Sequence, residues 1–95
     1  MIQAIGLRTD QKQRMDAIFD ANKPAILAAY KTFLGEQKKL NDLNKDPSAD
    51  KTRVFAAIDA VNQARASLQK ATSQMLLEIR SEMNADQVTK LEKLP

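Results

Sequence analysis

The amino-acid sequence predicts an all-α protein organised as a long antiparallel helical hairpin with short flanking helices. Only two Gly and three Pro occur among its 95 residues, so few positions oppose helix formation. Apolar residues recur in steps of three and four, the spacing of one helix face, and no alternating run typical of a strand appears. One short loop separates two long stretches with this spacing, and such a loop makes the two helices antiparallel neighbours.

Composition fits one folded domain over residues 1–95. The chain is 43% hydrophobic and 28% charged, with a net charge of +3. Both signs of charge are interspersed, and aromatic residues are few, so the basic stripe and stacking platform of a nucleic-acid binder are missing. No stretch approaches the ~20 apolar residues of a membrane span. We therefore expect neither nucleic-acid binding nor membrane insertion.

A first helix is expected over residues 8–44, after a frayed leader at residues 1–7. Pro24 interrupts it, because proline removes one backbone hydrogen bond and disfavours helix at the preceding residue. Two outcomes are open: one helix kinked at Pro24, or two helices with Asn22 capping the second. The apolar register survives the proline, which favours the kink. The apolar positions of this helix are Met15, Ile18, Phe19, Ile26, Leu27, Tyr30, Phe33, Leu34, Leu40 and Leu43.

A loop at residues 45–50 precedes the long helix expected over residues 47–83. Asp46 and Pro47 are suited to be its N-cap and first helical residue. At a 1.5 Å rise per residue the helix would be roughly 50 Å long, whereas a compact domain of this length has a radius of gyration of about 13 Å. A hairpin of such helices cannot bury all its apolar side chains, so we expect an elongated or curved homodimer.

A short C-terminal helix is expected over residues 84–94. Asn84 is a good N-cap, and Gln87 lies three residues later, where its side chain can complete a capping box. Met83 before the cap and Val88 after it are placed as a hydrophobic staple.

One short motif occurs twice, at residues 7–11 and 83–87. Each copy has an apolar residue, a capping position, an Asp and then a Gln. This pattern is also what any well-capped amphipathic helix start looks like. The motif residues are Leu7, Thr9, Asp10, Gln11, Met83, Asn84, Asp86 and Gln87.

Two such motifs on either side of a helical hairpin resemble the LTxxQ-motif family of bacterial periplasmic proteins. That family includes the Spy/CpxP-like chaperones and related periplasmic heavy-metal sensors, and the resemblance covers residues 7–94. The first copy departs from the family pattern, since Arg8 stands where the family has Thr. Its cap is therefore shifted to Thr9 or weakened. Met83 in place of Leu and Asn84 in place of Thr are conservative changes.

The resemblance implies a periplasmic, ATP-independent chaperone or envelope-stress protein that binds unfolded envelope proteins through exposed apolar patches. It also implies a homodimer, and in CpxP-like members a sensor kinase as a further partner. Two alternatives stay open: a metal-responsive sensor or regulatory module, and a purely structural helical dimerisation module.

Several apolar residues extend the helix faces beyond a narrow seam, and arginines lie near them. We take these residues as the candidate client or dimer surface. They are Leu27, Tyr30, Phe33, Leu34, Phe55, Ile58, Leu76 and Leu77, with Arg53, Arg65 and Arg80.

The sequence lacks the residues of most catalytic and metal sites. It contains no His and no Cys, which removes the usual general base, the thiolate nucleophile and the common zinc ligands. The carboxylate pairs Asp16 with Asp20 and Glu78 with Glu82 share helix faces, but such pairs are usually solvated surface charge. We therefore predict no enzyme activity, no cofactor and no metal site.

Overall fold

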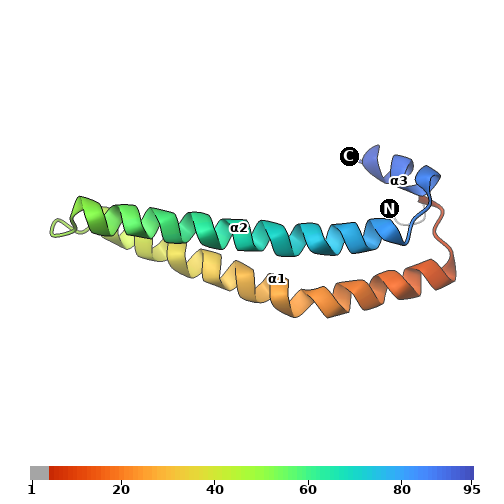
Figure 1. Ribbon diagram of the computed structural model, residues 1–95, viewed down its shortest axis with the longest axis horizontal. Coiled ribbons are helices and arrows are strands. Elements are labelled where there is room, and N and C mark those ends of the chain that lie inside the picture. The colour runs from red at the N-terminus through yellow and green to blue at the C-terminus, as the bar shows by residue number, and fades with distance from the viewer. Residues whose placement is uncertain (1–4) are drawn as a thin grey trace. The chain divides into compact units, whose positions relative to one another are not determined.

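In a computed structural model that describes residues 5–95, the protein has three helices and, over those residues, no strand. They are α1 (Thr9–Asn44), α2 (Lys51–Ser81) and α3 (Ala85–Glu92) (Figure 1). The helices α1 and α2 pack against each other as a hairpin, and α3 is the short C-terminal helix, which confirms the predicted fold class. Over residues 5–95 the hairpin has one short flanking helix, α3.

The chain divides into two compact units. The first unit joins Met1–Lys23 to Ser73–Pro95, and the second unit is Pro24–Thr72. Each is described by itself below. The expectations of one domain over residues 1–95 and of an elongated or curved homodimer stay predictions.

α1 runs through Pro24 as one helix. Asn22 does not cap a second helix there. Its side-chain amide instead donates to the carbonyl oxygen of Ile18 at 2.8 Å and to Glu78 of α2 at 3.2 Å. Since α1 continues through Pro24, the N–H groups that follow it are bonded within the helix and need no cap, so the two-helix alternative is not adopted.

α2 begins at Lys51, four residues later than expected, because Asp50 takes the capping position. The Asp50 carboxylate accepts the backbone N–H of Arg53 at 2.8 Å, the bond that an N-cap makes to the third helical residue. Asp46 instead closes a turn within the loop, where its carboxylate accepts the backbone N–H of Ser48 at 2.9 Å and the Ser48 hydroxyl at 2.7 Å. These two bonds lower the pKa of the Asp46 carboxyl.

The second unit has a narrow core. Val61 and Ala64 of α2 are buried at 3% and 5% exposure, and they are one helical turn apart on a single face. α1 and α2 lie side by side where they leave the loop at residues 45–50 (Figure 1). Since a two-helix layer has no third element, the side chains beside this seam remain accessible.

The first unit buries Ile5, Met15 and Ile79, at 4–6% exposure. The leader expected to be frayed thus contributes Ile5 to this core, while residues 1–4 of that leader lie outside the described residues. Gly6 turns the chain here with a φ of 75°, a left-handed conformation that glycine adopts without steric cost. None of the described helices is long and apolar enough to cross a membrane.

Candidate functional site

The two copies of the repeated motif meet in the first unit through Gln11 and Gln87. These are the buried polar residues of the described chain, at 2% and 4% exposure. Each side-chain amide donates to the other's side-chain oxygen at 2.9 Å. The second N–H of each amide donates to a backbone carbonyl beside the opposite copy: Gln11 to Glu82 at 2.8 Å and Gln87 to Gly6 at 3.0 Å. We call this arrangement the glutamine junction.

Each glutamine of the junction also closes its own helix start. The Gln11 side-chain oxygen accepts the backbone N–H of Arg8 at 2.9 Å, and the Gln87 oxygen accepts that of Asn84 at 3.0 Å. Both amides therefore have two donated and two accepted hydrogen bonds, which is full use of a primary amide. The junction ties the chain before α1 to the turn after α2.

The two caps differ in completeness. Asn84 accepts the backbone N–H of Gln87 at 2.8 Å, which completes a capping box at α3. Arg8 precedes the first residue of α1, and a guanidinium has no acceptor to offer. Only the returning half of the box, from Gln11, is present there. Thr9 lies inside the helix as its first residue.

Ion pairs surround the junction on its exposed side. Arg14 of α1 contacts Glu82 at 2.6 Å and Asp10 at 3.3 Å, and Arg8 contacts Asp10 at 3.1 Å. The hydrogen bond from Arg8 is the largest cause of the lowered pKa of Asp10, and the bond to Glu82 is the largest cause of the raised pKa of Arg14. These groups face solvent, so we expect each pair to stabilise the fold only slightly.

Large apolar side chains remain accessible in both units. Eight of them in the described chain are at least 37% exposed, and we call these eight the exposed apolar set. Seven are members of the candidate surface; the eighth, Phe19, was named only as an apolar position of the first helix. The set is Phe19, Leu27, Tyr30, Leu34, Phe55, Ile58, Leu76 and Leu77.

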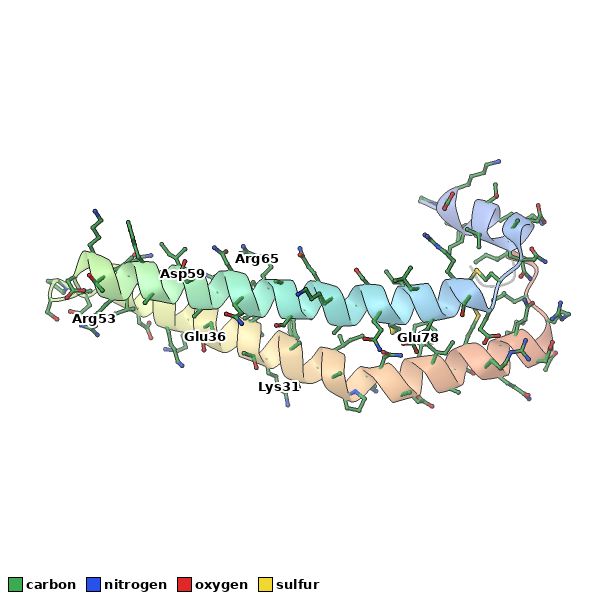
Figure 2. All side chains as sticks on the ribbon, in the orientation of Figure 1. Lys31, Glu36, Arg53, Asp59, Arg65 and Glu78 are labelled. Carbon is green, nitrogen blue, oxygen red and sulfur yellow. The ribbon has the colours of Figure 1, made fainter. Side chains whose placement is uncertain are left out.

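In the second unit, cations lie over aromatic rings of the candidate surface. The Arg65 guanidinium lies 5.5 Å from the centre of the Phe33 ring, and the Lys51 ammonium lies 5.4 Å from that of Phe55. Both distances are in the range of cation–π attraction. Arg65 and Arg53 both belong to α2 (Figure 2), and both are exposed. Phe33 is half-buried, which fits a ring covered by an arginine.

In the first unit, Leu76 and Leu77 are 54% and 63% exposed. Arg80 lies one turn further along α2 and contacts Glu92 at 3.9 Å. Leu76 also lines an apolar pocket of about 190 Å³ that Leu77 does not line. The two neighbouring leucines therefore differ in their surroundings although both face solvent.

The carboxylate pairs noted in the sequence are engaged with other partners or exposed. Glu78 accepts hydrogen bonds from Asn22 and Gln74; it lies on α2 in Figure 2. Glu82 pairs with Arg14. Within residues 5–95, no three His, Cys, Asp or Glu side chains gather where they could hold a metal ion.

Comparison with protein families places residues 3–90 in the family described as heavy-metal resistance. The match spans both helices of the hairpin and the glutamine junction. The chain belongs to the heavy-metal resistance family. Searches of curated proteins and of solved structures found no match. The heavy-metal resistance family belongs to the Spy/CpxP-like helical proteins of the LTxxQ type, in agreement with the resemblance that the repeated motif indicates.

The described residues do not fit a heavy-metal centre of the usual kind. Such centres use imidazole, thiolate, thioether or clustered carboxylates; this chain has no His and no Cys, so only Met and carboxylate side chains remain. Family membership and the residues present therefore point in different directions, and the exposed apolar set is the feature that remains to be accounted for.

Proposed function

We propose that this member of the heavy-metal resistance family is a periplasmic, ATP-independent chaperone that binds unfolded envelope proteins. The observation that carries the proposal is the balance of apolar side chains over residues 5–95. Eight large ones are at least 37% exposed, whereas five apolar residues are buried. Within the second unit, Leu27, Tyr30 and Leu34 of this set recur at the spacing of one face of α1, and exposed apolar side chains that gather on one face mark binding surfaces.

The exposed set suits weak, reversible binding. Full burial of a Leu or Phe side chain is worth ≈1.5–3 kcal/mol, so covering the exposed half of one would yield about 1 kcal/mol. Four or five such contacts would give about 4–5 kcal/mol, which is no larger than the cost of ordering a few residues of a flexible segment, so binding would be weak. An unfolded client would therefore exchange quickly, without a nucleotide-driven release step.

The basic residues near the apolar side chains favour the same use. Arg53 and Arg65 lie exposed on α2, Arg65 over the ring of Phe33, and the chain has a net charge of +3. Positive charge attracts acidic stretches of a client over longer distances than apolar contact does. It also keeps an apolar surface from associating indiscriminately.

A second copy of the chain is the other partner that we propose. Part of the exposed apolar set would close a homodimer, and the remainder would be offered to clients. At about 25 cal/mol per Å² of apolar surface removed from water, a seam of several hundred Å² would favour association. We assign the protein no enzymatic role and no cofactor.

The test is aggregation of a chemically denatured protein, measured by light scattering without ATP. The proposal expects suppression at near-stoichiometric ratios, fluorescence of a hydrophobic dye, and a dimer by light scattering coupled to size-exclusion chromatography. A monomer that gives no suppression at a fivefold excess contradicts it.

The family description favours a second candidate, a metal-responsive sensor or regulatory module that acts on a sensor kinase. Calorimetric titration of the full-length protein with Zn²⁺, Ni²⁺ and Cu⁺ separates the two. Stoichiometric binding together with a change in oligomeric state supports the sensor. A purely structural dimerisation module instead predicts a dimer that neither binds the dye nor suppresses aggregation.

A further inference from the structure

The first unit contains an apolar pocket of about 190 Å³, formed by every segment of that unit. We call it the first-unit pocket. The chain before α1 contributes Ile5 and Leu7, α1 contributes Met15 and Phe19, and α2 contributes Leu76 and Ile79. Lys12, Asp16, Met83 and Leu91 complete the lining. We propose that this pocket takes one aromatic side chain of an unfolded client, an inference that rests on the proposed function.

The volume matches one aromatic ring. An apolar cavity of about 150 Å³ lined by Leu, Ile and Phe stays dry in another protein and binds benzene. The first-unit pocket is somewhat larger and is also lined mainly by Leu, Ile and Phe, with two Met; unlike that cavity it opens to solvent, where Phe19 and Leu76 are exposed. It is too small for a long lipid acyl chain, and it lacks the convergent polar groups that orient a polar metabolite.

The lining chemistry favours an aromatic group over an aliphatic one. Met15 and Met83 both face the pocket, and thioether sulfur makes favourable contacts with ring edges. Phe19 adds a ring that can pair edge-to-face with a bound one. The charged lining residues Lys12 and Asp16 are of opposite sign, so the pocket does not select an anion or a cation, which fits a neutral ring.

Two members of the exposed apolar set line the pocket. Phe19 and Leu76 line it and are also 45% and 54% exposed. A client ring inside the pocket would therefore cover part of both side chains, while the neighbouring residues of the client reach the rest of the set in that unit. The pocket would supply a preferred anchor within an otherwise unselective surface.

The test uses N-acetyl-phenylalaninamide as the probe and the full chain labelled with ¹³C at the Met methyl groups. Met15 and Met83 line the pocket, whereas Met75 does not. The proposal expects saturable shifts of the Met15 and Met83 methyl resonances at millimolar probe and little change at Met75. N-acetyl-alaninamide should bind at least about tenfold more weakly, since a buried Phe side chain contributes ≈1.5–3 kcal/mol.

A pair of variants provides the matched control. Leu76→Trp places a bulkier side chain in the lining, and Leu77→Trp makes the same change one residue away, outside it. Both positions are more than half exposed, so neither change crowds a core, and circular dichroism checks the fold. We expect Leu76→Trp to weaken probe binding at least about fivefold and Leu77→Trp to leave it within twofold.

Equal shifts at the methyl groups of Met15, Met75 and Met83, or no shift at 20 mM probe, overturn the inference. That readout needs no variant, so misfolding of Leu76→Trp cannot obscure it. Suppression of aggregation without ring binding overturns the pocket inference alone. If the protein binds the probe but does not suppress aggregation, the proposed function is wrong. The pocket then does not serve to bind an unfolded client.

Discussion

Gln11 and Gln87 lie 76 residues apart in the sequence and hydrogen-bond each other in both directions, with each amide nitrogen 2.9 Å from the other's oxygen. The second amide N–H of Gln11 donates to the carbonyl oxygen of Glu82, and that of Gln87 donates to the carbonyl oxygen of Gly6. Each of these carbonyls lies two residues before the cap of the opposite motif copy. Each copy of the motif therefore makes the same two hydrogen bonds to the other copy: one to its glutamine and one to the backbone just before its cap.

The first prediction concerns this pair. Gln11→Ala removes one amide and leaves buried donors and acceptors of Gln87 and of the backbone without partners, at a cost of about 2–4 kcal/mol in the free energy of unfolding. Gln87→Ala should cost a similar amount. Once one partner is gone, the second substitution removes little more, so we expect the double variant to be less destabilised than the sum by about 1–3 kcal/mol. Urea denaturation measures all three.

Gln69→Ala is the control for the amide itself, because Gln69 is exposed within α2. It should change stability by less than about 0.5 kcal/mol. Strictly additive effects of the two junction substitutions would show that the glutamines act only as separate helix caps.

The sequence predicted each glutamine as a local capping residue but not their pairing. Helical periodicity and the Asn84 to Gln87 spacing are local signals, and they predicted the helices and the cap of α3. No local signal predicts which group accepts the second amide N–H of each glutamine. The carbonyl groups of Glu82 and Gly6 reach these amides only once the hairpin has formed. The recurrence of the whole motif at both ends of the hairpin was the only sign that the copies have a shared role.

The second prediction exploits the incomplete cap of α1. Arg8→Asn supplies the side-chain acceptor that the arginine lacks, and it should stabilise the protein by about 0.5–1 kcal/mol. It also removes the exposed contact to Asp10, which offsets only a few tenths of that gain. Asn84→Ala makes the opposite change at α3 and should cost about 1 kcal/mol. The midpoint temperature of thermal denaturation should therefore rise in Arg8→Asn and fall in Asn84→Ala. A lower midpoint in Arg8→Asn would show that the arginine has a role besides its place at the cap.

The third prediction concerns pH. Hydrogen bonds from Ser48 hold the pKa of Asp46 below its ordinary value in the folded protein. A lowered pKa stabilises the fold fully above the unfolded-state value near 4, and this stabilisation is lost as the pH falls through the folded-state pKa. NMR titration of the Asp46 carboxyl carbon should show the low midpoint, and Ser48→Ala should raise it. An unchanged midpoint in Ser48→Ala would assign the shift to another cause.

The start of α2 shows why side-chain roles are harder to predict than helices. Asp46 and Asp50 are both suited to cap a helix that follows, and Asp46 has the added signal of Pro47 after it. The choice depends on Ser48, whose N–H and hydroxyl both engage Asp46 and leave Asp50 to receive the N–H of Arg53. A competition between two such local side-chain to backbone hydrogen bonds is not readable from residue preferences.

The fourth prediction tests whether the exposed apolar set acts in binding rather than in folding. Phe55 and Leu77 are 54% and 63% exposed, so Phe55→Ser with Leu77→Ser should lower the free energy of unfolding of the monomer by no more than about 2.5 kcal/mol. The same double variant should need at least twice the molar ratio of the wild type to suppress aggregation. Ala56→Ser, at an exposed position beside Phe55, is the control for the added hydroxyl and should behave as the wild type. If the double variant instead dissociates a dimer and keeps full suppression, these two side chains belong to the contact between copies, and clients bind elsewhere in the set.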